Sequence, residues 1–369
     1  MYLCRNMTDE ELQSKTITWL RFPMIVGVLL IHSYNPNLNN GGMLFRDIPV
    51  TYPLFQFIRN LSSEVVARFC VPLFFLIAGY LFFYRISTFT PSIYADKLKK
   101  RIHSLLVPYL FWNAFALLAY VLLQEVFGIH NLAYGALPKV SAWEWTDYLR
   151  CFWDIRSPHY PLIYPLWFIR DLMITSLLTP FIYIGIKHLK AFFPLAFFFI
   201  WVFSLPIGVV GINTGALFFF SIGAYFSLNQ RNLVTEGRKL FRFSMLYPMV
   251  ALADTLCKGH NIDTYLHPIG ILLGMLFTIN LISYLLQKNR IKESTYLAGV
   301  SFFVYAAHEQ MLSQIRKMLV TVIPPQSESA YFALYLLPML ATILITLAIY
   351  YLLKKYCSAA MKIMVGARN

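Results

Sequence analysis

The first long apolar segment of this chain contains two residues suited to chemistry, Arg21 and His32. They lie eleven positions apart, a helical rotation of about 1,100°, or three turns plus about 20°. A helix over this segment therefore places both side chains on one face, about 16 Å apart along its axis. A permanent cation suits an anionic donor that carries phosphates or a thioester, and an imidazole that titrates near neutral pH suits a general base. The pair predicts a site that binds such a donor and removes a proton.

Each member of this pair also has a structural explanation. Arg21 could anchor the helix at the cytoplasmic interface by extending its side chain toward water, and His32 could join two helices by a hydrogen bond. A charge near the bilayer centre costs at least about 2.5 to 3.5 kcal/mol, so ionisable residues in a membrane segment are functional candidates by default. Function is the leading hypothesis for the pair, and the structural alternative stays open for each residue.

A second candidate group lies in the segment PLWFIRDLMI, where Trp167 and Asp171 fall about one helical turn apart. A carboxylate inside a membrane segment needs a cationic partner. The candidates for this partner are the neighbouring Arg170 and, on other segments, Arg68 and Arg21. We predict that Trp167, Asp171 and Arg68 bind substrate, and a structural ion pair at Asp171 is the alternative.

The segment SFFVYAAHEQM contains a third group, because Tyr305 and His308 are three residues apart and share one helix face. Glu309 follows directly, and a histidine beside a carboxylate is costly to bury in a membrane. We predict that Tyr305 and His308 contact substrate. Hydrogen bonding between helices is the alternative for each of them.

A basic cluster follows the second apolar segment and contains Lys97, Lys99, Lys100 and Arg101. Such a cluster attracts phosphates, so Lys97, Lys100 and Arg101 are predicted to form a cytoplasmic docking patch for coenzyme A. Ordinary charge in a cytoplasmic loop is the alternative. The sequence has neither a Walker loop nor a GxGxxG motif, so binding of ATP or a dinucleotide is not predicted.

The composition places these candidates in a membrane protein. Of the 369 residues, 58% are apolar and only 13% are charged, compared with roughly one quarter charged in a soluble domain. The formal net charge of +14 is concentrated in alternate loops, which indicates membrane topology, so nucleic acid is not an expected partner. The five cysteines lack the spacing of a metal site or a disulfide framework, and no metal is expected.

Apolar runs long enough to cross a hydrocarbon core of roughly 30 Å recur along the whole chain. By the positive-inside rule, the basic loops put both termini in the cytoplasm. The predicted fold is an all-α, polytopic bundle of about ten transmembrane helices, over residues 17–34, 65–84, 105–127, 162–184, 191–210, 211–228, 241–256, 266–286, 296–320 and 331–353. They form one transmembrane domain, 17–353, between a short cytoplasmic N-terminal segment, 1–16, and a cytoplasmic tail, 354–369.

With these features the chain resembles the acyltransferase-3 family of bacterial inner-membrane proteins, which acylate hydroxyl or amino groups of surface glycans and related acceptors. The resemblance spans most of the chain. It rests on Arg21 and His32 at the family's spacing in the first helix, and on four further features: the segment VPLFFLIAGYLF from Val71, the basic run before Pro108, the segment Pro165–Phe168, and Tyr305 with His308.

Two positions depart from the family pattern. Family members often have Arg-x-x-Arg in the basic region, where this chain has Lys97-x-x-Lys100. The residue before Gly79 is often serine in the family and is Ala78 here. Position 78 is therefore not expected to provide a nucleophilic hydroxyl.

The resemblance implies transfer of an acyl group, often acetyl from acetyl-CoA, to a hydroxyl group of a carbohydrate-type acceptor. Arg21 and His32 would be the essential catalytic pair. Acyl-CoA would be the donor substrate and no cofactor would be covalently bound, while a glycan or lipid-linked acceptor and membrane lipid would be the other partners. The protein is expected to be a multi-pass protein of the bacterial inner (plasma) membrane. The sequence has no GxSxG elbow, so an acyl-enzyme intermediate is not indicated.

Two other classes of function stay open. A transporter would use buried charges to carry substrate or protons by alternating access, with inverted repeats and paired discontinuous helices as its signs. Neither sign is clear in the sequence, although the segment 206–208 is placed to break one helix. A sensor or scaffold would keep the fold without its chemistry.

Overall fold

The fold is taken from a computed structural model, which describes residues 7–33, 39–40, 43–44, 52–128, 139–157, 159–205 and 207–366. Nearly all regular structure in these residues is helical, as predicted. The exception is a hairpin of two short antiparallel strands, β1 (Asn39–Asn40) and β2 (Met43–Leu44). Two predictions fall partly outside the described residues. Position 34, the end of the predicted helix over 17–34, and position 206, in the predicted break over 206–208, are not described.

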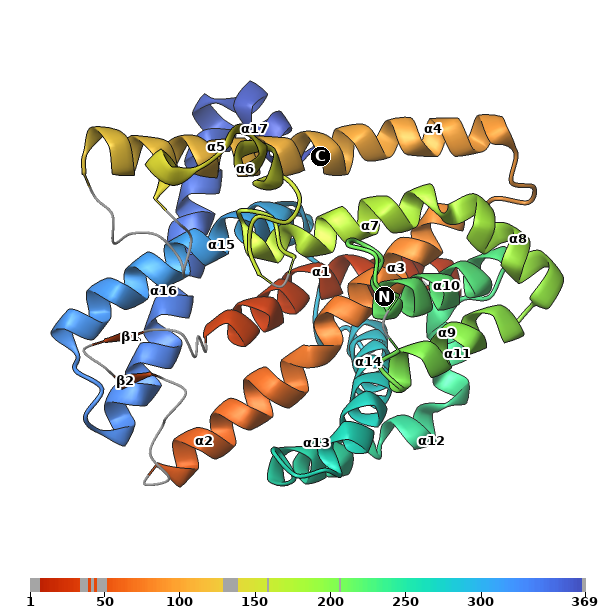
Figure 1. Cartoon of the computed structure of the whole chain (residues 1–369). Coiled ribbons are helices and arrows are strands. Elements are labelled where there is room, and N and C mark those ends of the chain that lie inside the picture. Colours follow the sequence, from red (N-terminus) through yellow and green to blue (C-terminus); the bar gives the residue numbers. More distant parts are fainter. Residues whose placement is uncertain are drawn as a thin grey trace, which may run out of the picture.

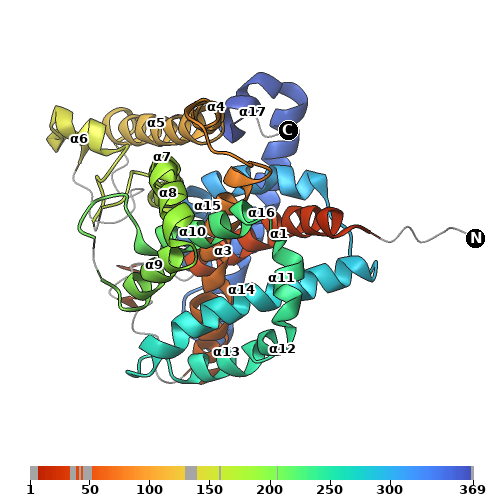
Figure 2. The ribbon, with the colours of Figure 1, turned by 90° about the vertical axis from the view of Figure 1, so that its right-hand side faces the viewer.

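The first helix, α1 (Asp9–Ser33), lies at the centre of the molecule (Figures 1 and 2). It starts eight residues before the predicted boundary at 17, where the Thr8 hydroxyl accepts a hydrogen bond from the backbone of Glu11 at 3.2 Å. Three acidic residues in the first turn, Asp9 to Glu11, complement the positive end of the helix dipole. The helix packs mainly against α14 (Asp263–Gln287), α15 (Thr295–Val322) and the helix that contains Arg68.

The helix with Arg68 runs without a break from Pro53 to Phe83 and changes its winding on the way. Its segments are α2 (Pro53–Arg59), the π-helical η2 (Asn60–Val65), the 3₁₀ turn η3 (Val66–Phe69) and α3 (Cys70–Phe83). In the π-helical turn the Ser63 hydroxyl donates to the Leu30 carbonyl of α1 at 2.6 Å. A π-helical turn changes the direction of side chains without ending the helix. Here it lies where the Ser63 hydroxyl attaches this helix to the last part of α1.

Two glycines allow α3 to cross α10 (Thr214–Leu228) at very short range. A Cβ atom at Gly79 would lie 2.1 Å from the carbonyl oxygen of Phe220, and one at Gly223 would lie 2.0 Å from that of Leu76. Without side chains, the two backbones come into direct contact, as small residues permit in membrane helix pairs. The AGY sequence at Ala78 to Tyr80 therefore has a packing role.

This crossing predicts that Gly79→Ala lowers thermal stability. The added methyl group meets backbone rather than a movable side chain, and overpacking of this kind costs about 1 to 3 kcal/mol. Gly299→Ala, in α15, is the matched control, because the nearest atom to its Cβ is the Tyr350 hydroxyl at 3.6 Å. Thermal unfolding of both variants in detergent checks the prediction. Equal unfolding temperatures would contradict it.

A long helix runs along one side of the molecule, at the top of Figure 1. It extends from Pro91 to Val126 through α4 (Pro91–Arg101), η4 (Ile102–Leu106), α5 (Val107–Val121) and η5 (Leu122–Val126). The C-terminal helix α17 (Ser358–Val365) packs against α5, where the Trp112 indole donates to the Met364 carbonyl at 3.0 Å. Part of the predicted tail 354–369 is thus a docked helix.

The remaining elements are shorter, apart from α16 (Glu328–Tyr356). The segment between the long helix and Tyr164 contains η6 (Val140–Ala142) and α6 (Trp145–Arg150). The others are η7 (Tyr164–Leu166), α7 (Trp167–Leu177), α8 (Thr179–Leu189), α9 (Phe192–Val202), α11 (Leu233–Lys239), α12 (Phe241–Ser244) and α13 (Tyr247–Leu256).

The chain is a polytopic membrane protein, but it has fewer long spans than the ten predicted. Among the described residues, five helices are long and apolar enough to cross a membrane, and a sixth span results if the pair Tyr164–Leu177 and Thr179–Leu189, bent by 59°, counts as one. The predicted spans over 191–210 and 211–228 correspond to helices of 11 and 15 residues. At 1.5 Å per residue, these are too short for a roughly 30 Å core. Apolar composition alone had suggested full spans there.

Candidate active site

The structure brings two rings from distant parts of the chain next to His32, in the last turn of α1. The His32 ring lies 5.1 Å from that of Tyr164 in an edge-to-face arrangement and 5.2 Å from that of His308. Tyr164 begins the 3₁₀ turn η7, and His308 lies in the middle of α15. His32 and His308, both predicted as site residues, thus lie side by side, and their roles stay predictions; Tyr164 was not predicted.

Tyr164 connects His32 to a carboxylate. Its hydroxyl is hydrogen-bonded to Nδ1 of His32 and also to the side chain of Glu309, and Nδ1 lies 4.0 Å from Oε2 of Glu309. In the tautomer in which Nδ1 donates to the Tyr164 oxygen, the lone pair for accepting a proton is on Nε2, and no hydrogen bond joins Nε2 to the residues described. An imidazole oriented through one nitrogen by a tyrosine and a carboxylate has the arrangement of a general base.

His308 is held in place by its own helix, and Tyr305, one turn earlier, holds η7 near the site. Its Nδ1 bonds to the carbonyl of Tyr305, while the Tyr305 hydroxyl donates to the carbonyl of Pro165, next to Tyr164. His308 is fully buried, and within the described ranges its Nε2 has no hydrogen-bond partner. Tyr305 therefore helps to position η7, which begins with Tyr164, and His308 adds a second imidazole beside His32.

A buried arginine completes the surroundings of His32. Arg316, 2% exposed, donates from Nη2 to the His32 carbonyl at 2.9 Å, so a cation lies at the negative end of the α1 dipole. Its charge also acts on Glu309. Sequence reasoning missed Arg316, although it lies eight residues after His308 on α15, near the same helix face.

Arg68 lies near this group but not beside Asp171. It pairs with Glu64, one turn earlier on the same helix, and its charge acts on His32. Asp171 is instead paired with its neighbour Arg170, whose Nε lies 3.0 Å from Oδ1. Of the three predicted cationic partners for Asp171, the adjacent one is correct.

Arg21 lies on α1, the helix that carries His32, and its side chain is exposed. It makes no hydrogen bond or ion pair with the residues described. Because Arg21 is the thirteenth residue of a 25-residue candidate span, an exposed guanidinium there has to face water or an anionic ligand. Its common helix with His32 is as predicted, and a role in donor binding stays a prediction.

The predicted docking cluster lies on α4, at one end of the molecule. Lys97 and Arg101 both approach the Phe82 ring, with Nζ at 5.9 Å and Cζ at 5.7 Å from its centroid, while Lys100 is exposed. In the part of the chain that the structure describes, no hydrogen bond or ring contact joins this cluster to His32. The cluster is thus a separate basic surface next to the end of α3.

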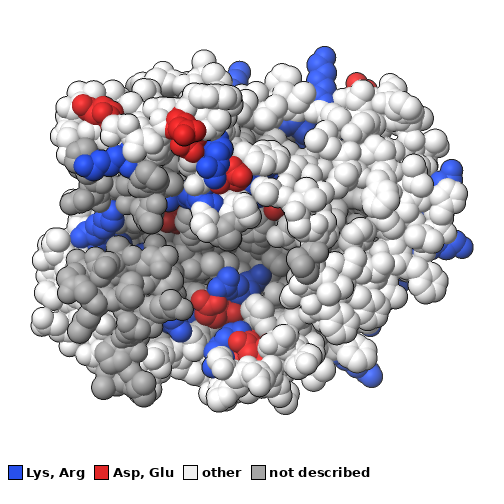
Figure 3. All heavy atoms as spheres, viewed as in Figure 1, with Lys and Arg blue, Asp and Glu red and all other residues white. Residues whose placement is uncertain are grey.

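Trp167 and Asp171 lie at the start of α7, close to the preceding loop, rather than well inside a span as the hydropathy had indicated. They line a cavity together with Tyr160, whose ring lies 5.9 Å from that of Tyr164. The cavity is therefore next to the His32 group. In Figure 3, acidic and basic side chains gather at the upper left of one face and around the hollow near its centre, while most of that face is uncharged.

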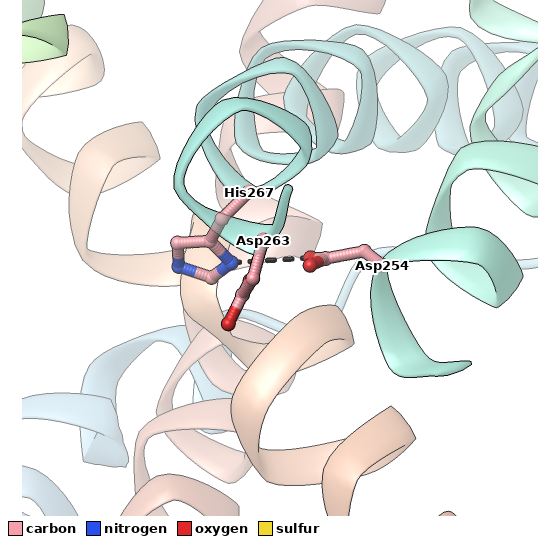
Figure 4. Close-up of side chains that lie close together, drawn as sticks. All are labelled: Asp254, Asp263 and His267. Carbon is pink, nitrogen blue, oxygen red and sulfur yellow. Dashed lines mark hydrogen bonds and ion pairs between the residues drawn. The ribbon is translucent and has the colours of Figure 1, made fainter. Parts of the chain in front are cut away.

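A second polar cluster joins α13 to α14. Asp254, Asp263 and His267 have ligand atoms within 4.8 Å of one another, which is metal-like spacing that the sequence did not reveal (Figure 4). The ammonium of Lys258 lies among them, 2.9 Å from Asp254, 2.6 Å from Asp263 and 3.2 Å from Nδ1 of His267. Lys258 therefore provides the positive charge that balances the carboxylates, and the cluster works as an ion-pair connection between the two helices.

Comparison with known proteins bears on the whole chain. The family model for an acyltransferase domain matches residues 15–351. One similar protein is the succinoglycan biosynthesis protein ExoH of Rhizobium meliloti (strain 1021), which is 26% identical over 373 residues, covering 96% of this chain and 93% of that relative. No solved structure matches the chain.

Proposed function

This chain belongs to the acyltransferase-3 family, and from that premise we propose that it moves an acyl group from acyl-coenzyme A to a hydroxyl group of a cell-envelope glycan. The acyl group in this proposal is acetyl. The observation that carries it is the oriented imidazole of His32, with Nδ1 bonded to Tyr164, Glu309 behind it and Nε2 available. Acyl transfer to a hydroxyl needs such a base, because a neutral hydroxyl attacks a thioester poorly.

The reaction starts with proton removal. Nε2 of His32 takes the proton of the acceptor hydroxyl while the hydroxyl oxygen attacks the thioester carbonyl carbon, forming a tetrahedral intermediate. The resulting imidazolium is stabilised by the hydrogen bond from Nδ1 to Tyr164 and by the carboxylate of Glu309. The carbon–sulfur bond then breaks, and the departing coenzyme A thiolate takes the proton from Nε2. The products are an ester and coenzyme A, and the enzyme returns to its starting state.

A covalent acyl-enzyme is not part of the proposal. Burial raises the pKa of the Cys151 thiol to about 12, so this cysteine is protonated at neutral pH and a poor nucleophile. Position 78, near the middle of α3, is alanine and has no hydroxyl. Direct transfer between bound donor and acceptor uses only the groups that surround His32.

Arg21 and the basic cluster on α4 are assigned to the donor. Coenzyme A is highly anionic, and the exposed guanidinium of Arg21 and the ammonium groups of Lys97 and Lys100 suit its phosphates. The positive-inside pattern supports a cytoplasmic entry side, with both termini in the cytoplasm and the protein in the inner membrane of a bacterium. The 16 Å between Arg21 and His32, about three helical turns, further supports outward movement of the acyl group along α1.

A glycan acceptor is supported by the relative reported above. The name of that Rhizobium protein places it in the biosynthesis of a polysaccharide, succinoglycan. A polysaccharide or its lipid-linked precursor offers hydroxyl groups at the membrane surface, where a membrane-embedded acyltransferase can reach them. We therefore assign the same class of acceptor to this chain.

The direct test uses the purified protein in lipid nanodiscs with radiolabelled acetyl-CoA and a lipid and glycan extract of bacterial envelopes. Release of coenzyme A together with label in a glycan fraction is the expected result. If the folded protein releases no coenzyme A and labels no acceptor, the proposed donor is wrong. If the label stays on the glycan after alkaline treatment, the product is not an ester, because base cleaves esters.

Arg21→Ala is expected to raise the KM for acetyl-CoA by about 10- to 100-fold, the loss of one charge-assisted contact of about 1.5 to 3 kcal/mol. The kcat should change much less, since Arg21 lies about three turns from His32. Arg85→Ala is the control, because Arg85 is an exposed arginine that pairs with Glu10. Steady-state kinetics in nanodiscs measure both constants. An unchanged KM would remove Arg21 from donor binding.

One observation favours transport as a second candidate function. The bend of 59° between Tyr164–Leu177 and Thr179–Leu189 makes a discontinuous helix next to the polar site, and discontinuous helices line substrate sites in transporters. Uptake of a labelled glycan precursor into proteoliposomes, with no covalent change to it, would support this function. Uptake that requires acetyl-CoA and yields an acylated product would instead support acyl transfer.

A further inference from the structure

A cavity of about 230 Å³ lies at the start of α7, beside the His32 group. Its walls come from three places in the sequence: the loop before η7, the first turns of α7 and the segment before α10. The lining residues that matter here are Tyr160, Trp167, Arg170, Asp171, Gly211 and Asn213.

The charges of this cavity are balanced from within. Arg170 and Asp171 are 4% and 3% exposed, and both Nε and Nη2 of Arg170 lie 3.0 Å from Oδ1 of Asp171. Nη1 of Arg170 donates to the carbonyls of Trp153 at 2.6 Å and His159 at 2.8 Å. Because each charge is already paired, the cavity offers little net charge to a ligand, and a strongly anionic molecule gains nothing from entering it.

The backbone at the cavity adopts conformations that few residue types allow. Gly211 has a φ of +88°, and a Cβ atom there would lie 2.1 Å from Cδ1 of Ile174. His159, whose carbonyl binds Arg170, has a φ of 119°, which non-glycine residues rarely adopt. Strained backbone of this kind persists where surrounding contacts hold it, and it concentrates at binding sites.

Several polar groups on the cavity walls have no hydrogen-bond partner among the residues described. They are the indole N–H of Trp167, the hydroxyl of Tyr160, the amide nitrogen of Asn213 and Oδ2 of Asp171. Burial raises the pKa of Tyr160 above its usual value, so its hydroxyl stays protonated at neutral pH. The set combines hydrogen-bond donors with an acceptor, next to two aromatic rings.

Sugar rings match this combination. Their hydroxyl groups both donate and accept hydrogen bonds, and their C–H faces pack on aromatic rings such as those of Trp167 and Tyr160. Coenzyme A does not match it, because it is anionic and because a cavity of about 230 Å³ is smaller than the roughly 300 to 1,000 Å³ of sites for drug-sized ligands. One sugar ring is the ligand that fits both the volume and the neutral walls.

Two aromatic contacts connect the wall of the cavity to the reacting groups. The ring of Tyr160 lies 5.9 Å from that of Tyr164, which lies 5.1 Å from the ring of His32. A ligand in the cavity is thus separated from His32 by the two tyrosines. It is close enough to be covalently linked to a sugar at His32 and too far away to be the group that loses a proton.

We infer that this cavity is an acceptor subsite, which binds the neutral sugar unit next to the one whose hydroxyl group is acylated. The inference rests on the proposed function and specifies its acceptor as a neutral oligosaccharide of at least two units. The subsite holds the acceptor chain in register, so that one hydroxyl group meets Nε2 of His32.

The test measures binding and catalysis separately. Equilibrium dialysis uses labelled neutral tetrasaccharides of glucose and galactose and a hexuronic acid tetrasaccharide, with protein in nanodiscs and without acetyl-CoA. The wild-type protein is expected to bind a neutral tetrasaccharide more tightly than the hexuronic acid one. Trp167→Ala should weaken this binding by about tenfold, the loss of one aromatic contact and one donor. In the transfer assay the same variant should raise the KM for the tetrasaccharide with little change in kcat.

Two further variants make the test specific. Asn213→Asp replaces the amide donor but keeps Oδ1, which caps α10 by accepting from the Ala216 backbone at 3.0 Å, so it should weaken binding without unfolding the helix. Trp145→Ala removes a tryptophan that is 74% exposed on α6 and outside the cavity, and it should bind as the wild type does.

The outcomes separate this inference from the proposed function. If the wild type binds no neutral tetrasaccharide, or if Trp167→Ala and Asn213→Asp bind as tightly as the wild type, the subsite is wrong even where acyl transfer is observed. If the wild type binds and the two variants do not, the subsite stands even where no acyl transfer is detected, and the proposed function alone is then in question.

Discussion

Replacing His32 with alanine is expected to lower kcat for acyl transfer by about 100- to 10,000-fold, the usual contribution of a general base. His32 is the group whose Nε2 is available while Nδ1 is fixed by Tyr164. Binding of acetyl-CoA should change little, because the donor is assigned to Arg21 and the α4 cluster. The measurement is single-turnover transfer from radiolabelled acetyl-CoA in nanodiscs, together with dialysis of the donor.

Two controls make the His32 result specific. His188→Ala removes an exposed histidine of α8 and should leave the rate unchanged. Added imidazole should partly restore His32→Ala, since the substitution leaves space for an imidazole where the side chain was. If a folded His32→Ala protein transfers at the wild-type rate, the proposed mechanism is wrong, and His308 becomes the next candidate base.

The placement of candidate residues on shared helices was predictable because it depends on local spacing. Arg21 and His32 share α1, and Tyr305 and His308 share one face of α15, as helical periodicity requires. The pairing of Asp171 with Arg170 was among the predicted possibilities for the same reason. Each of these relations is set by residues within three turns of one another.

The partners of His32 were not predictable in the same way. Tyr164 lies 132 positions along the chain from His32, and Arg316 lies 284 positions away. Such contacts depend on how α1, η7 and α15 pack, and a single sequence does not specify this packing. Glu309 was visible next to His308, but only the fold directs it toward Tyr164.

The number of spans shows the same limit for the fold. Hydropathy located the apolar segments, and each predicted range contains a helix, although some of these helices fill only part of their range. Hydropathy did not predict the bend after Leu177 or the shortness of α9 and α13, because an apolar composition suits a buried short helix as well as a full span. The 28-residue α15 is long enough to cross a membrane, but the consecutive polar residues His308, Glu309 and Gln310 near its centre lower its hydropathy.

Glu309→Gln is expected to lower kcat by about 100-fold or more, since replacing the orienting carboxylate of a catalytic histidine by an amide costs up to about 10,000-fold in the serine proteases. The substitution keeps the shape of the side chain but removes the negative charge that stabilises the His32 imidazolium. Tyr164→Phe, which breaks the hydrogen-bond chain, should cost less because Glu309 still lies 4.0 Å from His32. Steady-state kinetics of both variants measure these losses, and Glu125→Gln, at an exposed carboxylate, is the control.

The double variant decides whether Tyr164 and Glu309 act through His32 as one unit. If they do, Tyr164→Phe combined with Glu309→Gln should be little slower than Glu309→Gln alone, because groups in one chain have strongly non-additive effects. Additive losses would mean that each residue contacts the reacting atoms independently. A rate for Glu309→Gln equal to that of the wild type would show that the carboxylate has only a structural role, and the base at His32 would then be oriented by Tyr164 alone.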